Sequence, residues 1–129
     1  MSVHSLKAVN KIEPAQRSVS DLVTNYFEAL FKRYNTPEDF RVATLAKQLN
    51  FSKRTFQRLL QNEGLTFADL LDSARKKHAE ELIFDESLSV EEISKLLGFI
   101  DRSGYLRSHK KWFGIPPRKY RTDFCIRAR

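Results

Sequence analysis

The chain has 129 residues, enough for one ordinary domain or two very small ones, and its 23 Lys and Arg against 16 Asp and Glu give a formal net charge of +7. This basic balance favours a polyanionic partner, either nucleic acid or an anionic membrane surface. The single cysteine, Cys125, excludes an intramolecular disulfide and a multi-cysteine zinc site, and no apolar run approaches the roughly 20 residues of a membrane span.

Residues 1–17 are polar and show no sustained period, which predicts a flexible N-terminal lead. They also lack the apolar core of a secretion signal, so we expect a cytoplasmic protein without membrane partners. The first helix is predicted over Val19–Tyr34, capped by Ser18 or Ser20 and ended by Asn35 and Pro37. Its apolar residues recur at steps of three and four, so it needs a partner surface. They are Leu22, Val23, Tyr26, Phe27, Leu30, Phe31 and Tyr34.

A pair of short helices is predicted next. Apolar residues at i, i+3, i+4 and i+7 predict a helix over residues 42–49. Asn50 and Phe51 form the expected turn, and Ser52 caps a second helix over Lys53–Asn62. Two short helices across a tight turn are typical of a helix-turn-helix.

The segment Thr66–Asp85 contains no Gly or Pro, so a single helix is the economical prediction. A helix of its 20 residues would rise about 30 Å, comparable to one turn of B-DNA at about 34 Å. Such a rod could hold two small units at a fixed spacing.

A second helix-turn-helix is predicted near the C-terminus. Ser89 and Glu92 form a capping box, Gly98 ends the first helix, and a second helix follows over roughly Asp101–Trp112. Gly114 closes this helix, and Pro116 and Pro117 can only begin another. The segment Ser89–Arg129 carries ten Lys and Arg against four Asp and Glu, so the positive charge is concentrated here.

The two helix-turn-helix segments form an internal repeat, which indicates architecture rather than chance. Before the turn, equivalent residues of the two segments are 48 positions apart in the sequence. After the turn they are 49 positions apart, which pairs Phe56 with Tyr105 and Arg58 with Arg107. The residues matched at 48 are Val42, Leu45, Leu49, Asn50 and Phe51 with Val90, Ile93, Leu97, Gly98 and Phe99.

The second segment closely resembles the C-terminal signature of AraC/XylS-type bacterial transcription regulators, and the resemblance covers roughly residues 41–121. The matching residues are Ser89-Val90-Glu91-Glu92-Ile93, Leu97-Gly98-Phe99, Asp101, Tyr105, Arg107, Lys110, Trp112-Phe113-Gly114, Pro117 and Tyr120-Arg121. The resemblance implies an all-α fold of seven helices, in two homeodomain-like helix-turn-helix subdomains joined by a long linker helix. We expect subdomains at 18–65 and 86–123, the linker helix at 66–85 and a tail at 124–129.

The same resemblance implies a sequence-specific regulator of transcription that binds double-stranded DNA with two recognition helices in adjacent major grooves. Activators are the commonest type, and RNA polymerase is the expected protein partner. A small-molecule effector domain is not expected in this chain, which could act alone or be the DNA-binding part of a longer protein. The alternatives are a non-specific nucleic-acid-binding protein and an interaction module that uses the apolar stripe of the first helix.

Base contacts are expected from the outward faces of both recognition helices, since positions three and four apart are neighbours. Arg pairs with guanine and Gln with adenine in the major groove, and Ser103 could contact a base or a phosphate; an ordinary solvated face is the alternative. The expected base contacts are Arg54, Gln57, Arg58, Arg102, Ser103 and Arg107. The expected backbone contacts are Lys53, Lys110, Lys111, Arg118 and Lys119.

Catalysis, cofactors and metals are not expected. The three histidines lack metal-ligand spacing, and the adjacent carboxylates of Glu80-Glu81 and Glu91-Glu92 fall on different helix faces. The sequence also contains no Gly-rich phosphate loop or nucleophile elbow. Trp112 and Phe113 are interpreted as core residues rather than a platform for bases.

Three residues of the second segment depart from the family pattern. Ile100 stands where the pattern has a small polar cap, so Asp101 could cap instead and shift the helix by one residue. Gly104 lies inside the helix, and His109 occupies the place of a buried Phe. We therefore expect the second recognition helix to contribute salt-dependent affinity more than base discrimination.

Overall fold

The computed structural model describes residues 18–33 and 35–125, and within them the chain forms seven α-helices and no strand. The predicted lead (residues 1–17), Tyr34 and residues 126–129 of the predicted tail lie outside the described residues. The helices are α2 (Val19–Phe31), α3 (Val42–Gln48), α4 (Lys53–Asn62), α5 (Phe67–Leu82), α6 (Val90–Leu96), α7 (Arg102–Phe113) and α8 (Pro117–Tyr120). A 3₁₀ turn, η2 (Pro37–Phe40), and a π-helical turn, η3 (Arg121–Cys125), complete the fold.

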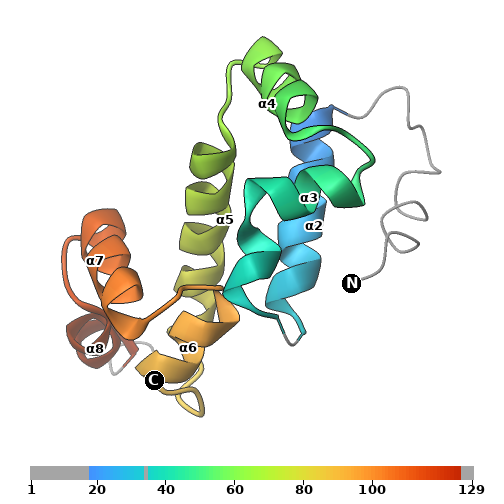
Figure 1. Cartoon of the computed structure of the whole chain (residues 1–129). Coiled ribbons are helices and arrows are strands. Elements are labelled where there is room, and N and C mark those ends of the chain that lie inside the picture. The colour runs from blue at the N-terminus through green and yellow to red at the C-terminus, as the bar shows by residue number, and fades with distance from the viewer. Residues whose placement is uncertain (1–17, 34, 126–129) are drawn as a thin grey trace.

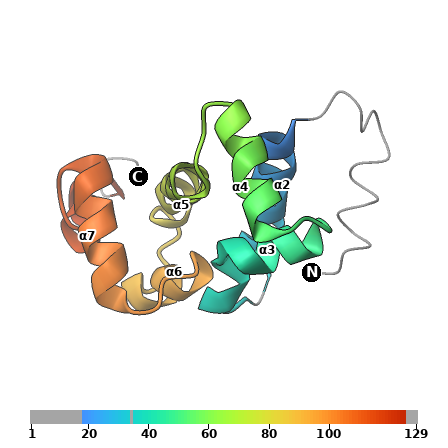
Figure 2. The same cartoon turned by 45° about the horizontal axis from the view of Figure 1, so that its top comes forward.

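Helix α5 lies between two groups of helices, α2–α4 on one side and α6–α8 on the other (Figure 1). Seen nearly along the axis of α5, helices α4 and α7 lie on opposite sides of it (Figure 2). The all-α architecture of two helix-turn-helix units about a central helix is therefore as predicted.

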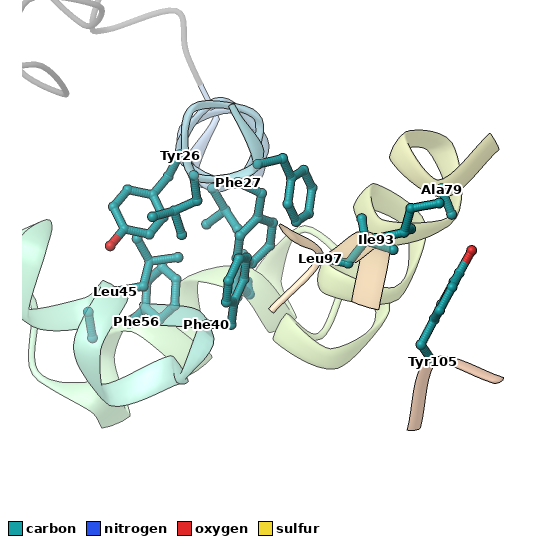
Figure 3. Close-up of a cluster of buried hydrophobic side chains, with 14 of the residues drawn as sticks. Tyr26, Phe27, Phe40, Leu45, Phe56, Ala79, Ile93, Leu97 and Tyr105 are labelled. Carbon is teal, nitrogen blue, oxygen red and sulfur yellow. The ribbon is translucent and has the colours of Figure 1, made fainter. Parts of the chain in front are cut away.

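The apolar stripe of α2 forms the centre of the first group. Ser18 caps this helix by accepting a hydrogen bond from the Asp21 N–H at 3.1 Å, and the carboxylate of Glu63 accepts from the Val19 N–H at 2.9 Å. Phe27 is fully buried and contacts Phe40, with ring centroids 6.1 Å apart (Figure 3). It also contacts Phe67, with ring centroids 5.5 Å apart. The stripe thus joins α2 to η2 and to the start of α5.

Beyond the end of α2 lies a 3₁₀ turn that was not predicted, whereas Asn35 ends the helix as predicted. Thr36 and Asp39 form a capping box with Pro37 in the first turn, and this local signal begins η2. The Asn35 amide donates to the Leu30 carbonyl at 2.9 Å, which closes the end of α2.

Helix α5 is shorter than the predicted segment: its 16 residues rise about 24 Å, not about 30 Å. At the end of this helix, Arg121, which lies far along the sequence, takes up carbonyl oxygens of the residues that follow Leu82. Its guanidinium donates to the Ile83 carbonyl at 3.0 Å and to the Asp85 carbonyl at 3.2 Å. A local sequence pattern cannot report a cap of this kind.

Candidate DNA interface

One backbone hydrogen bond closes both helix-turn-helix turns in the same way. The Phe51 N–H donates to the Ala46 carbonyl at 2.9 Å, and the Phe99 N–H donates to the Ser94 carbonyl at 3.1 Å. Each pair is related by the offset of 48, so the internal repeat in the sequence is a repeat of backbone geometry.

The residue at the start of each turn is left-handed, with φ of 63° at Asn50 and 79° at Gly98. Asn and Gly are the residues that adopt this conformation most readily. At Gly98 there is a second requirement, because a Cβ atom would overlap the ring of Phe40. Phe40 belongs to η2, so the second turn packs directly against the first group of helices.

The first recognition helix, α4, presents a polar face to solvent. Ser52 caps it by accepting from the Thr55 N–H at 3.1 Å, and Phe56 and Leu60 anchor its inner face in the core. The predicted base contacts Arg54, Gln57 and Arg58 are exposed and line one hollow of about 540 Å³.

Gln61 lines the same hollow and is also exposed, although it was not among the predicted contacts. The sequence could have indicated Gln61, because it follows Gln57 by four residues and Arg58 by three, and residues at these spacings lie on the same face of a helix.

The second recognition helix, α7, begins at Arg102 and ends at Phe113, one residue later than the expected span. Asp101 is its cap and accepts from the Gly104 N–H at 2.9 Å, as the sequence analysis anticipated. The cap of α4 is Ser52, which is 49 residues before Asp101. Ile100 is therefore the one extra residue of the second turn.

The predicted contacts of α7 are exposed but do not form one group. Arg107 lines a hollow of about 370 Å³ with Ile100 and Gly104. Arg102 lines another, of about 430 Å³, with Arg118 of α8 and residues at the start of α6. Ser103 is exposed between these two arginines in the sequence.

The predicted backbone contacts are exposed on three helices. Lys53 stands at the first position of α4, Lys110 and Lys111 in the last turn of α7, and Arg118 and Lys119 on α8. Lys119 also lies 3.7 Å from Asp123 in an exposed ion pair, which is worth little in water.

His109 is fully buried in α7, at the position of Leu60 in α4. Its Nδ1 lies 3.1 Å from the Tyr105 hydroxyl, and its ring centroid lies 4.7 Å from that of Phe113 and 5.2 Å from that of Tyr120. Burial lowers the pKa of His109 to about 4, so the imidazole is neutral at pH 7.

Arg75 of α5 ties the second turn to the rest of the fold. Its Nε donates to the Leu97 carbonyl at 2.8 Å and its Nη2 to the Gly98 carbonyl at 2.9 Å. The guanidinium lies 4.1 Å from the Phe99 ring centroid and 5.5 Å from that of Phe40. Burial lowers the Arg75 pKa to about 10, which leaves it charged.

Two further contacts attach the second group of helices to the rest of the fold. The Asn35 amide donates to the Leu96 carbonyl at 3.0 Å, and the Trp112 indole N–H donates to the Asp72 carboxylate at 3.0 Å. Trp112 thus packs against α5, as its interpretation as a core residue predicted. We call the contacts of Asn35, Phe40 and Arg75 with residues 96–98 the junction.

The described residues contain no group of three or more His, Cys, Asp or Glu side chains that could hold a metal ion. Within the same part of the chain, no helix combines the length and the apolar character needed to cross a membrane.

Comparison with known proteins gives the family of this fold. Residues 45–123, more than half of the chain, match the family model described as a helix-turn-helix domain. The chain belongs to the AraC-type helix-turn-helix family. The transcriptional activator AggR of Escherichia coli is 34% identical over 106 residues, which cover 81% of this chain and 38% of AggR.

Two other members show the extent of the likeness. The HTH-type transcriptional regulator VqsM of Pseudomonas aeruginosa is 32% identical over 83 residues, 64% of this chain and 26% of VqsM. The DNA-binding domain of the global transcriptional factor AdpA, solved with a target DNA, has the same fold. Its TM-score is 0.66 at 24% identity, over 86% of this chain and 96% of that domain. The chain therefore spans 38% of the length of AggR and 26% of the length of VqsM.

Proposed function

We propose that this chain is a sequence-specific regulator of transcription that binds double-stranded DNA and activates its target genes. The observation that carries this proposal is the pair of helix-turn-helix units with one turn geometry, fixed on either side of α5. A non-specific nucleic-acid-binding protein does not need two such units. Activation rather than repression is proposed because the relative AggR is a transcriptional activator.

The two recognition helices are proposed to enter adjacent major grooves. Base contacts come from Arg54, Gln57 and Arg58 of α4, joined by Gln61, and from Arg102, Ser103 and Arg107 of α7. The exposed cations Lys53, Lys110, Lys111, Arg118 and Lys119 contact phosphates, which positions the protein without specifying sequence. Arg102 and Arg118 line the same hollow, so this proposed base contact lies near one of the proposed phosphate contacts.

An activator at a promoter would act in the cytoplasm and contact RNA polymerase, and we include both in the proposal. The assignment is non-enzymatic, because DNA recognition uses the exposed polar faces of α4 and α7 and involves no bond-forming step.

Selection of bound sequences from random duplexes, followed by footprinting, tests the proposal. The expected site contains two half-motifs about one helical turn apart, one for each recognition helix. Arg58→Ala should weaken binding to this site, whereas Lys77→Ala is the matched control, because Lys77 is an exposed cation on α5 outside both recognition helices. Failure to enrich any sequence would leave a non-specific binder or an interaction module instead.

A further inference from the structure

Ile100 is the most exposed of the three large apolar side chains that the described residues leave open to solvent, at 84%. Phe84 and Phe124 are 45% and 41% exposed, and both lie outside the two helix-turn-helix units. Single exposed apolar residues are common on protein surfaces, so exposure alone assigns no role to Ile100.

The position of Ile100 in the repeat is more informative. It is the single residue by which the second turn is longer than the first, and Asp101 rather than Ile100 caps α7. The first turn closes with the same backbone hydrogen bond and caps α4 without such an insertion. Neither the turn nor the cap therefore needs an isoleucine here.

The surroundings of Ile100 place it beside the start of the second recognition helix. Ile100 precedes the Asp101 cap and lines one hollow with Gly104 and Arg107 of α7, and Phe40 and Arg75 of the junction also line this hollow. Gly104 contributes no side chain, and a Cβ there would come within 3.2 Å of the Phe99 ring. An apolar side chain and a guanidinium thus border one open hollow at the start of α7.

The edges of base pairs in the major groove offer one apolar group, the C5-methyl of thymine. On the basis of the proposed function, we infer that Ile100 determines specificity by packing on a thymine methyl in the second half-site. This thymine lies next to the base pair that Arg107 contacts. The exposed side chain of Ile100 is buried only in the complex with DNA. This contact explains the inserted residue, whereas the fold of the free chain does not require it.

Deoxyuridine in place of thymidine tests this contact, because it keeps the hydrogen-bonding edge and removes only the methyl group. Each thymine of the selected second half-site is replaced in turn, and binding is measured for the wild type, Ile100→Val and Ile100→Ser. At one position the wild type should lose affinity on the order of fourfold, the effect of one buried methyl group. Ile100→Ser should bind both duplexes equally, and Ile100→Val should keep most of the preference.

Phe84→Ala is the matched control, because it removes an exposed apolar side chain away from both recognition helices and should keep the wild-type preference for thymine. The circular dichroism spectrum and thermal unfolding of Ile100→Ser should match the wild type, since the side chain is exposed. A loss on deoxyuridine that is the same in the wild type and Ile100→Ser would overturn the role of Ile100. So would a second half-site insensitive to every replacement. Failure to enrich any site would contradict the proposed function instead.

Discussion

The first and second helix-turn-helix units share one turn and differ in what their inner faces contact. In the first, Asn50 begins the turn and is exposed to solvent. In the second, Gly98 begins the turn and packs against Phe40 from the other half of the molecule. The difference shows that one unit is built around its own helix α2, whereas the other is attached to the rest of the fold through its turn.

The recognition helices differ in a complementary way. On α4 the outward positions hold Arg54, Gln57 and Arg58, and at the corresponding positions α7 holds Ser103, Leu106 and Arg107. The inner positions change from Phe56 and Leu60 to Tyr105 and His109. The first helix thus carries more groups that can pair with bases, and the second carries a buried polar pair.

The second turn requires both a left-handed residue at position 98 and the absence of a Cβ atom beside Phe40. Gly98→Asn separates these two requirements and should have the largest effect on stability. Asparagine adopts the left-handed conformation in the first turn, so the cost comes mainly from overlap with Phe40. We expect the free energy of unfolding to fall by about 3 kcal/mol, measured by urea denaturation. Asn50→Gly should change it by about 0.5 kcal/mol or less, because the Asn50 side chain is exposed and glycine adopts its left-handed conformation readily. An equally large loss in a Phe40→Ala background would contradict this explanation.

Arg75→Met should have the next largest effect, because it removes two hydrogen-bond donors while keeping an unbranched apolar side chain. The carbonyls of Leu97 and Gly98 would lose these donors. We expect a loss of about 2–3 kcal/mol in the free energy of unfolding. The matched control is Lys77→Met, whose side chain is 71% exposed and makes only a surface ion pair with Glu28. Similar losses in the two variants would show that the junction contributes little.

The contrast between the two outward faces is tested by Arg58→Ala and Arg107→Ala. Arg58→Ala should cost about 1–3 kcal/mol of binding free energy on the specific site and relax base preference at one position. Arg107→Ala should mainly reduce the dependence of affinity on salt concentration and should change base preference less than Arg58→Ala does. Titrations with salt on the specific site and its single-base variants measure both effects. The proposed asymmetry is wrong if Arg107→Ala abolishes discrimination more sharply than Arg58→Ala does.

The smallest effect concerns pH and the buried pair of α7. The His109 pKa falls from its usual value of 6.5 to about 4 on folding, so the unfolded chain binds a proton in this window and the folded chain does not. Stability should therefore decrease as pH falls from about 6.5 to about 4.

The double variant Tyr105→Phe/His109→Leu copies the inner face of α4 and leaves no buried hydroxyl without a partner. Thermal unfolding at pH 5 and pH 8 should show a drop of about 1–2 kcal/mol in the wild type that the double variant lacks. The same drop in both proteins would assign the pH dependence to other groups.

The elements made by local signals could be predicted from the sequence. Ser52, Ser89 and Asp101 cap their helices as expected, and the offset of 48 appears in the structure as equivalent hydrogen bonds. The 3₁₀ turn η2 had a local signal in Thr36 and Asp39 and could have been found.

The contacts of the junction and those of Arg121 could not be predicted in this way. No pattern near Arg75 or Arg121 in the sequence indicates their partners, and only the fold brings them to carbonyls more than 20 residues away. For the same reason, the sequence does not show the Trp112–Asp72 hydrogen bond, which anchors α7 together with the Asp101 cap. It remains a prediction that α7 contributes more to salt-dependent affinity than to base discrimination. The outward side chains of α7, which include fewer groups that can pair with bases, support this prediction.

The junction also has a consequence for how the two recognition helices cooperate on DNA. When two binding units are linked, the second contact becomes intramolecular and depends on an effective concentration at its site. Arg75 ties the turn before α7 to α5, and Phe40 packs against the same turn from the first group of helices. In the proposed complex with DNA, the effective concentration of α7 at its half-site would therefore be high at one half-site spacing and low at others. Two modest contacts within one chain would then cooperate at that spacing.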